Sequence, residues 1–590
     1  MHDNAKRKNG AVLTALIRSN KIALSANRKA YISYLILSLV MTANSFLSLA
    51  TTQYTINCAY RLFKKSIDYQ SVVMGISLFA IAAIIFMGIG LLQRTMENRL
   101  MLDVTYYFEK SLNHKLGTIK WDFYESHETC LKIHEVRSNT LETIKKMINN
   151  TVFFLTCIPL AAIFGYYLLQ INIFAAIAYI VLIFLFNRAA GKRFVKISGL
   201  WEELQPYTQK QSYFFGMSGD KITHQEFKFH RLFEFVSSKW EALFQEEYKI
   251  RLKIFRKYEF LLQTARILMN LPYIAMLLAV TYEIAMGRLE IGFLFMANQL
   301  FNNIIDTTAS IQDKIANSKI ESRYIKTYDE ICGLADIAET NALLLSCDIH
   351  MKNITYTYPQ SDVKALNHLN FSIKHGEKIA VVGVNGSGKT TCTNLLLSLT
   401  DHFKGSISGN GRTIDLSNSV SCILQDFAQY QMTVRENIEA GAPDRSFTEE
   451  ELMSILDKVG LKDTILSFEK GIYTSLGQLE QGIELSKGQW QRLAIARLLA
   501  KDDASVWILD EPTAYLDPLS EIEIYHMIYR LAGSRTVLFI SHRLGFAKRA
   551  DRIVLFEGGQ ITEQGTHEEL IRQNGVYAKM YRSQESWYAA

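Results

Sequence analysis

One stretch decides the fold of the C-terminal half of this 590-residue sequence, Gly383-Val384-Asn385-Gly386-Ser387-Gly388-Lys389-Thr390. It follows the apolar run Ile379–Val382 and precedes a helix-like segment, Thr391–Leu399. Its glycines let the backbone turn tightly, so that N–H groups can surround phosphate oxygens at a helix N-terminus. Lys389 would then reach the β- and γ-phosphates, and Thr390 would hold Mg²⁺. The spacing predicts a nucleoside triphosphate site.

Two later runs have the pattern of buried strands that end in polar residues. Ser505–Leu509 leads to Asp510 and Glu511, and Arg535–Ile540 leads to His542. Ligands of open α/β sheets bind at the carboxyl ends of the strands. At that edge Asp510 suits Mg²⁺, Glu511 suits a catalytic base, and His542 would contact the γ-phosphate.

The N-terminal half has a different composition. The whole chain is 49% hydrophobic and too long for one core, so its length predicts two to four domains. No charged residue lies between Lys146 and Arg188. As a helix that interval would measure about 60 Å, against about 30 Å for the hydrocarbon core of a bilayer. It therefore predicts two membrane spans with a turn at Gln170–Asn172.

Four further segments are expected to span a membrane. Tyr31–Thr51 and Ser71–Leu92 are uncharged and long enough. Leu261–Ile284 and Ile291–Ile311 carry a few charges and amides, and the alternative for this pair is a buried, soluble helical hairpin. The total of six spans places both termini on one side of the membrane.

The charge pattern favours a cytoplasmic location for that side. The N-terminus is basic, with Lys6, Arg7, Lys8, Arg18, Lys21, Arg28 and Lys29. Arg61, Lys64 and Lys65 fit less well, because they would face outward. The first apolar stretch is too short for a cleaved signal peptide, and residues 10–28 are interpreted as an interfacial helix. The net charge of +6 belongs to inward-facing loops, so no nucleic acid is expected as a partner.

Two long charged segments separate the spans, at about 93–146 and 188–258. They are predicted to continue the helices into the cytoplasm. Trp121–Glu125 and Phe214–Ser218 are expected to reverse the chain there, where a short transverse helix could touch another domain. The seven cysteines are scattered singly, so neither a disulfide framework nor a metal site is predicted.

Taken together, the chain resembles an ABC transporter, specifically a half-transporter of the exporter fold, over nearly its whole length. The motifs occur in the family's order: an aromatic residue in Thr357-Tyr358-Pro359, the phosphate loop, Gln425, a signature at 485–489, Glu511, a D-loop at Ala514-Tyr515-Leu516-Asp517, and His542. The N-terminal half matches by architecture alone. The resemblance implies an all-α transmembrane domain of six helices, followed by an α/β P-loop ATPase domain with a helical subdomain.

The expected domains follow from these features. Residues 1–30 form a cytoplasmic N-terminus with the interfacial helix, residues 31–320 the transmembrane domain, and residues 321–346 a linker. Residues 347–590 form the nucleotide-binding domain, with its helical subdomain at about 427–500.

The resemblance also implies roles for individual residues. ATP would be bound by Tyr358, Gly383, Val384, Asn385, Gly386, Ser387, Gly388, Lys389, Thr390, Thr391 and Gln425. Mg²⁺ would be held by Thr390, Gln425 and Asp510. Glu511 would polarise the attacking water while His542 steadies the γ-phosphate. A second chain would complete each site with Ser486, Lys487, Gly488, Gln489 and Asp517, which implies a dimer. Asp517 alternatively caps the helix that begins at Pro518.

Lys487 departs from the family pattern, because glycine usually stands at this position of the signature. Two interpretations remain open. The lysine is a tolerated variation in an active homodimer, or the chain pairs with a different half-transporter and its signature serves a weak site.

Polar residues in the expected sixth span are candidates for a substrate cavity, since ionisable groups at membrane depth are functional candidates. Asn298, Asn302 and Asp306 lie there, and Arg266 of the fifth span lies at a similar depth. We expect Asp306 and Arg266 to pair or to meet a charged substrate. The alternative is that both are wet interfacial charges.

The expected function is ATP-driven export of a peptide, an amphipathic small molecule or a lipid. The expected location is the plasma membrane of a bacterium. Membrane lipid, the substrate and a second half-transporter chain are the expected partners. Import on an exporter fold, as in siderophore uptake, and an ATP-gated channel or regulator are the alternatives.

Overall fold

The computed structural model describes residues 2–171, 177, 181, 204–219, 221–337, 347–358, 361–400, 402–409, 412–413, 419–478, 481–512 and 518–589. The chain divides into two compact units. The helical unit comprises Met1–Thr118 and Leu131–Leu334, and the sheet unit comprises Ile119–Cys130 and Ala335–Ala590. The short segment Ile119–Cys130 thus packs with the C-terminal half.

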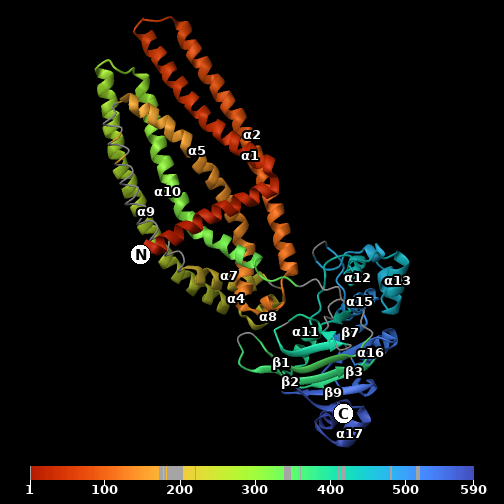
Figure 1. Cartoon of the computed structure of the whole chain (residues 1–590). Coiled ribbons are helices and arrows are strands. Elements are labelled where there is room, and N and C mark those ends of the chain that lie inside the picture. Colours follow the sequence, from red (N-terminus) through yellow and green to blue (C-terminus); the bar gives the residue numbers. More distant parts are fainter. Residues whose placement is uncertain are drawn as a thin grey trace. The chain divides into compact units, whose positions relative to one another are not determined.

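Long helices make up the helical unit. The described elements are α1 His2–Phe63, α2 Tyr69–Thr118, α4 His127–Glu135, the π-helical turn η1 Val136–Thr140, α5 Leu141–Ile171, α7 Gln205–Gly219, α8 Lys221–His230, α9 Phe233–Ala285 and α10 Gly292–Cys332. The start of α4, up to Cys130, belongs to the sheet unit. Figure 1 shows α1 and α2 side by side as one long hairpin, and α9 and α10 as another. α10 ends at Cys332, inside the segment 321–346 that was expected to be a linker.

A kink at Asn27 divides α1 into two helices. Asn27 has extended backbone angles, φ −157° and ψ 93°, and its Oδ1 accepts a hydrogen bond of 3.0 Å from the Ala30 backbone N–H. Its Nδ2 donates to Asp103 of α2 at 2.7 Å. Asn27 therefore caps the second helix, as asparagine commonly does. The helix before it covers residues 10–26 of the segment expected to be an interfacial helix, and its place at a membrane interface stays a prediction.

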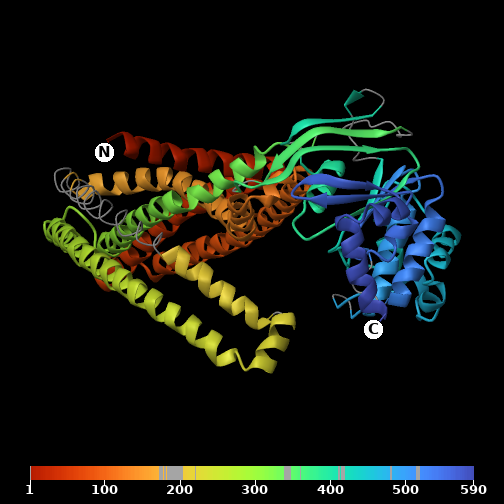
Figure 2. The same ribbon diagram turned by 90° about the horizontal axis from the view of Figure 1, so that it is seen from below.

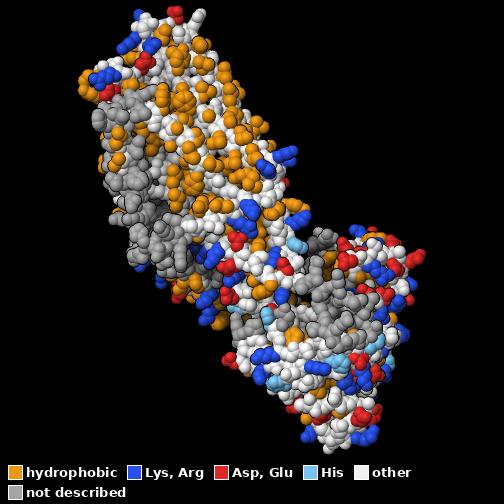
Figure 3. Space-filling view, in the orientation of Figure 1, with side chains coloured by type: hydrophobic (Ala, Val, Ile, Leu, Met, Phe, Trp, Pro, Cys, Tyr) orange, Lys and Arg blue, Asp and Glu red, His pale blue; other side chains and the backbone are white. Residues whose placement is uncertain are grey.

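Three of the described helical stretches are long and apolar enough to cross a membrane, namely Gly10–Phe63, Tyr69–Thr118 and His127–Leu168. α9 contains a shorter apolar stretch, Asn270–Ala285. The fourth expected span falls almost entirely outside the described residues, so the total of six stays a prediction. Figure 3 shows hydrophobic side chains gathered over much of the helical unit, with charged side chains near its ends.

Both expected chain reversals can be located. α3, Asp122–Glu125, is a short helix within Trp121–Glu125, as predicted, and it belongs to the sheet unit. The second reversal was placed too early, because α7 runs through Phe214–Ser218 to Gly219. The chain turns between α7 and α8, so α8 is the short helix at this reversal.

Two sheets form the sheet unit. The order β2-β1-β4-β5 describes the smaller sheet, and β10-β9-β3-β8-β7-β6 describes the larger one. Their bounds are β1 Ile349–Thr357, β2 Lys364–Ile373, β3 Lys378–Gly383, β4 Lys404–Gly409, β5 Arg412–Thr413, β6 Val420–Ile423, β7 Val506–Asp510, β8 Thr536–Ile540, β9 Arg552–Glu557 and β10 Gln560–Gly565. Strands β9, β3, β8, β7 and β6 run parallel, and β7 and β8 are buried throughout. Such continuous apolar strands are typical of a parallel sheet that is covered on both faces.

Helices flank these sheets. Their bounds are α11 Lys389–Leu396, α12 Val434–Glu439, α13 Glu449–Lys458, α14 Lys462–Leu466, α15 Lys487–Ala500, α16 Pro518–Ala532, α17 His567–Gln573 and α18 Val576–Ala589. In Figure 2 the green strands lie along one side of the unit and the blue helices along the other. Figure 1 places α12, α13 and α15 together at one end of the unit, which matches the expected helical subdomain.

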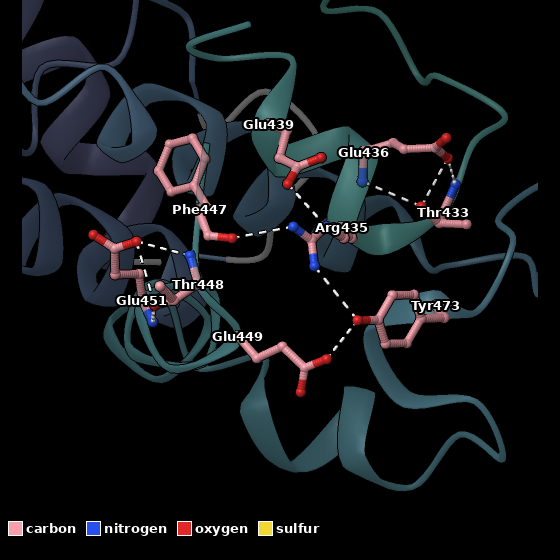
Figure 4. A network of polar contacts seen from close by, with 9 residues as sticks. All are labelled: Thr433, Arg435, Glu436, Glu439, Phe447, Thr448, Glu449, Glu451 and Tyr473. Atoms are coloured by element: carbon pink, nitrogen blue, oxygen red, sulfur yellow. Dashed lines mark hydrogen bonds and ion pairs between the residues drawn. The ribbon is translucent and has the colours of Figure 1, made fainter. Parts of the chain in front are cut away.

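Polar contacts tie the helical subdomain together (Figure 4). Capping boxes close the N-termini of α12 and α13, through Thr433 with Glu436 and Thr448 with Glu451. The Tyr473 hydroxyl donates to Glu449 of α13, while the Arg435 guanidinium of α12 donates to that hydroxyl and to Glu439. Each capping box satisfies backbone N–H groups that would otherwise lack a partner.

Candidate functional site

The phosphate loop connects β3 to α11 with backbone angles that need glycine. Gly383 has φ +150°, and a Cβ there would lie 2.4 Å from the Phe556 carbonyl oxygen. Gly388 has φ +103°, and a Cβ there would lie 2.7 Å from the Ala365 carbonyl oxygen. Any side chain at either position would collide with backbone. The loop therefore keeps an open cradle at the N-terminus of α11, where anions bind readily.

Two buried polar groups of the loop are suited to a phosphate. The Lys389 ammonium donates to the carbonyl oxygens of Gly383 and Val384 at 2.9 and 3.0 Å. Burial lowers the pKa of Lys389, an effect that Glu511 and Asp510 oppose. The Ser387 hydroxyl is buried and lacks a hydrogen-bond partner among the described residues. Because buried polar groups normally have partners, this unpaired hydroxyl in the cradle fits a phosphate ligand.

Asp510 ends β7 directly beside the end of β8, where it pairs with Ile540 in the sheet register. Only 3% of Asp510 is exposed. Burial, reinforced by the charge of Glu511, raises the pKa of Asp510 to about 6, and a hydrogen bond with the Thr390 side chain opposes this rise. A carboxylate and a hydroxyl in contact are oxygen ligands of the kind that Mg²⁺ takes. The pair Asp510 and Thr390 therefore fits the expected metal.

Glu511 and His542 face each other across the strand ends. Glu511 has φ +47°, a conformation rare for glutamate, and its backbone N–H donates to the Ile540 carbonyl at 2.9 Å. Its Oε1 lies 2.7 Å from Nδ1 of His542. A carboxylate only accepts hydrogen bonds, so Nδ1 carries the proton and Nε2 is left to meet another group. Unusual backbone angles often occur at functional sites, which agrees with the base expected at Glu511.

Tyr358 lines the same cavity as these groups. Its hydroxyl lies 3.0 Å from the Thr391 hydroxyl, and its ring packs edge-on against Tyr356 with centroids 5.0 Å apart. Tyr358 is half-buried and lines the cavity. This arrangement is compatible with stacking on adenine, the role expected for Tyr358.

These groups line one cavity of about 870 Å³, within the range of ligand sites. Its lining consists of Tyr358, Ala365, Gly383, Val384, Asn385, Gly386, Ser387, Gly388, Lys389, Thr390, Thr391, Gln425, Asp510, Glu511, His542, Met580 and Gln584. Every residue expected to bind ATP within one chain is present. Met580 and Gln584 of α18 were not expected, because no motif marks them. Their only sequence signal is helical spacing from the apolar start of α18.

The signature residues lie elsewhere. Ser486 caps α15 by accepting from the Gln489 backbone N–H at 3.3 Å, and the Gln489 side chain accepts from the Ser486 backbone N–H at 2.9 Å. Lys487 is exposed in the first turn of α15, and Gly488 follows it. None of the described residues 485–489 lines the cavity of the same chain. Asp517 lies outside the described residues.

Three of the proposed cavity residues of the helical unit lie on one face of α10. Asn298, Asn302 and Asp306 are spaced by four residues and are exposed. Asn298 accepts a hydrogen bond from the Tyr273 hydroxyl of α9. Arg266 lies in α9, but its side chain is outside the described residues. The expected pairing of Arg266 with Asp306 therefore stays a prediction.

A family model agrees with this site. The model described as "ABC transporter" matches residues 366–514, which include the phosphate loop, the signature, Asp510 and Glu511. Residues 366–514 belong to an ABC transporter domain. The sheet unit that contains them is called the ABC domain below.

Similarity to individual proteins extends the comparison. The chain is 39% identical over 241 residues to the subtilin transport ATP-binding protein SpaT of Bacillus subtilis, covering 40% of this chain and 39% of that protein. It is 36% identical over 240 residues to the nisin transport ATP-binding protein NisT of Lactococcus lactis subsp. lactis, covering 40% of each. It is 39% identical over 243 residues to the ATP-dependent lipid A-core flippase of Photobacterium profundum, covering 40% of this chain and 41% of that protein. The matches thus span about 40% of the length of these relatives.

The fold comparison covers nearly the whole chain. The structure titled "Structure of a bacterial Atm1-family ABC exporter with ATP bound" superposes with a TM-score of 0.76 at 21% identity. The superposition covers 94% of this chain and 98% of that one. The fold expected from the sequence, that of an ABC exporter, is confirmed.

Proposed function

We propose that this chain is an ATP-driven membrane exporter in which hydrolysis of ATP by the ABC domain reorients a cavity in the helical unit. The observation that carries the proposal is the meeting of the phosphate loop, Asp510, Glu511 and His542 in one cavity. The exporter fold supports it for the chain as a whole.

The residues of the cavity divide the chemistry of hydrolysis. Loop N–H groups and Lys389 neutralise phosphate charge, which is the main requirement of phosphoryl transfer. Glu511 orients and polarises the attacking water, and Nε2 of His542 faces the γ-phosphate. Mg²⁺ held by Thr390, Gln425 and Asp510 would supply further charge neutralisation.

The variant Glu511→Gln tests this assignment. A glutamine keeps the size of the side chain but cannot act as a base, so we expect ATP turnover to fall by about 10²-fold or more. ATP binding should persist, because the loop and Tyr358 are unchanged. Turnover by purified protein in lipid nanodiscs, measured beside nucleotide binding, checks both outcomes. Hydrolysis by Glu511→Gln at the wild-type rate would contradict the role of Glu511.

A second chain is part of the proposal, because the signature residues do not line the cavity of their own chain. A partner would supply Ser486, Gly488 and Gln489 to each nucleotide. Because Lys487 departs from the usual signature, the second chain is either an identical copy or a different half-transporter. A stable homodimer with robust ATPase activity, purified from this chain alone, would exclude the heterodimer.

For the substrate we propose a peptide, an amphipathic small molecule or a lipid. The names of the similar proteins, which concern subtilin, nisin and lipid A-core, support this range. We further propose that Asn298, Asn302 and Asp306 face the transported molecule. A screen for ligands that stimulate the ATPase in nanodiscs would identify it, and Asp306→Asn should then weaken the stimulation. Unchanged stimulation and transport in Asp306→Asn would remove Asp306 from the cavity.

The proposed location is a bacterial plasma membrane, with both termini in the cytoplasm. The basic N-terminus and the ATP requirement support this orientation. Uptake of substrate into inside-out vesicles would establish export, whereas uptake into right-side-out vesicles would favour import.

A further inference from the structure

The C-terminal helix α18 contributes to the nucleotide cavity. Met580 and Gln584 line it together with the phosphate loop and His542. The sequence motifs assign no role to α18. Its contact with the cavity is therefore a feature that only the folded ABC domain reveals.

Gln584 bridges the backbone on both sides of Arg543. Its Nε2 donates to the His542 carbonyl oxygen at 2.6 Å. Its Oε1 accepts from the Leu544 backbone N–H at 2.8 Å. A carboxamide has both a donor and an acceptor, so one glutamine side chain matches the two opposite backbone groups.

Other contacts also hold this segment, including an ion pair between Arg543 and Glu521 of α16 and a 3.0 Å hydrogen bond from the Ala547 N–H to the Leu544 carbonyl. The Ser541 N–H donates to the Val381 carbonyl of β3 at 3.2 Å, and the Arg543 N–H donates to the Ser541 hydroxyl at 3.0 Å. These bonds fix the start of the loop as it leaves β8. The bonds from Gln584 fix the His542 carbonyl and the next turn, where Leu544 is fully buried.

α18 is itself anchored firmly at its N-terminus. The Glu563 carboxylate of β10 accepts from the backbone N–H groups of Val576 and Tyr577 at 2.5 and 3.1 Å. An anion at this position also stabilises the helix dipole. Tyr577 is fully buried, and its hydroxyl lies 2.9 Å from Nδ1 of His567. Gln584 follows Tyr577 by about two turns, so the anchored helix presents it to the loop.

We propose that Gln584 is a positioning residue for ATP hydrolysis. By holding the backbone of His542 it keeps Nδ1 at 2.7 Å from the Glu511 carboxylate. Nε2 is thereby aimed at the γ-phosphate. The proposal rests on the proposed ATPase function, and it makes Gln584 act through His542 rather than on the nucleotide.

Three variants test the proposal by steady-state hydrolysis in nanodiscs. Gln584→Ala removes both bonds and should lower kcat by about 5- to 30-fold, the range expected for one or two hydrogen bonds. Gln584→Asn keeps the carboxamide but shortens its reach, so it should behave like Gln584→Ala. Gln584→Glu keeps an acceptor for the Leu544 N–H and should be intermediate. The KM for ATP should change less than about twofold in Gln584→Ala and Gln584→Asn, because the phosphate loop and Tyr358 are unchanged.

Glu585→Ala is the matched control, because Glu585 is an exposed neighbour on the same helix. It should keep the wild-type kcat. In protein that already carries His542→Ala, the further change Gln584→Ala should lower the single-turnover rate by less than about twofold. The effects of the two changes should not add, because Gln584 acts through His542. An undiminished cost in that background, or a raised KM at unchanged kcat, would overturn the proposal.

Hydrogen–deuterium exchange tests the same contact without turnover. Residues 541–546 should exchange faster in Gln584→Ala and Gln584→Asn than in the wild type or Glu585→Ala. Gln584→Glu should retain protection at Leu544. Unchanged exchange in Gln584→Ala would refute the contact even if the chain hydrolyses no ATP, so failure of the proposed function is distinguishable from failure of this inference.

Discussion

A buried carboxyl group with a raised pKa lies at the centre of the nucleotide cavity. Asp510 is held there because β7 must end beside β8 for the sheet to form. Burial and the charge of Glu511 raise its pKa to about 6. In the absence of metal, the ionised form of Asp510 therefore carries an energetic cost.

The first prediction concerns Asp510→Asn in protein free of nucleotide and metal. The raised pKa means that the folded state holds the proton more tightly than the unfolded chain, so the wild type loses stability as pH rises from about 4 to about 6. Asparagine carries no charge, so the stability of the Asp510→Asn variant does not fall over this pH range. The variant should unfold at a higher temperature than the wild type above pH 6, by up to roughly 3 kcal/mol in free energy, and the difference should vanish near pH 4.

Thermal unfolding between pH 4 and 8 in EDTA checks this prediction. Asp444→Asn, at an exposed position of the helical subdomain, serves as the control and should show no pH-dependent difference. A stability difference for Asp510→Asn that did not change with pH would contradict it.

Among the elements, α3 makes contacts that its length would not suggest. This four-residue helix lies between the long helices α2 and α4, yet it packs with the ABC domain. The Tyr356 hydroxyl of β1 donates to Glu125 at 3.3 Å, and Nε2 of His402 lies 3.6 Å from Asp122. Burial and the neighbouring Glu125 raise the pKa of Tyr356 to about 12, so it stays a donor at neutral pH. α3 thus packs with the ABC domain although it follows α2 and precedes α4 in the chain.

The second prediction follows from this contact. Tyr356→Phe removes the hydroxyl and leaves the ring in its buried place. One hydrogen bond contributes about 1 kcal/mol, so we expect transport per ATP hydrolysed to fall by up to about fivefold. Basal hydrolysis should remain within about twofold of the wild type, because Tyr356 does not line the cavity.

The matched control is Tyr473→Phe, which also removes a tyrosine hydroxyl but from the helical subdomain (Figure 4). It should reduce stability without changing the ratio of transport to hydrolysis. Equal effects of both variants on that ratio would argue against a specific role of the α3 contact.

For the whole molecule, the proposed dimer raises the question of how the nucleotide cavity is completed. The cavity of one chain contains the phosphate loop and Glu511 but none of the described signature residues. A symmetric pair of chains could complete both cavities at once, since identical chains usually associate with closed symmetry.

The third prediction is complementation between two variants that impair opposite sides of the proposed shared site. Glu511→Gln inactivates the phosphate-loop side and Ser486→Ala weakens the signature side. When the two variants are mixed and reconstituted together, half of the dimers should contain one chain of each variant. In such a dimer one of the two sites combines an intact Glu511 with an intact Ser486, so hydrolysis should return. About a quarter of wild-type turnover is expected from random pairing. Turnover of the mixture that equals the mean of the two variants alone would contradict the shared site.

The motifs of the nucleotide site could be found from the sequence because their requirements are local. Gly383, Gly388 and Lys389 adopt backbone conformations and contacts set within a few residues, so their spacing alone indicates a phosphate cradle. The strand ends at Asp510 and His542 were also recognisable, because continuous apolar runs mark buried parallel strands. The family fold followed from the order of these motifs.

Other features were set by contacts between residues far apart in the chain. The end of α7 at Gly219, rather than within Phe214–Ser218, was not apparent from the local sequence. Gln584 lies 42 positions from His542, so no periodicity or motif could join them. The sequence by itself determined the P-loop site and the exporter fold, since local backbone chemistry and hydrophobic length dictate them. The sequence also predicted a short helix near Trp121–Glu125 that could touch another domain. Only the tertiary structure decided that this helix meets Tyr356 and His402 and that α18 contacts the His542 loop, because long-range packing brings those groups together.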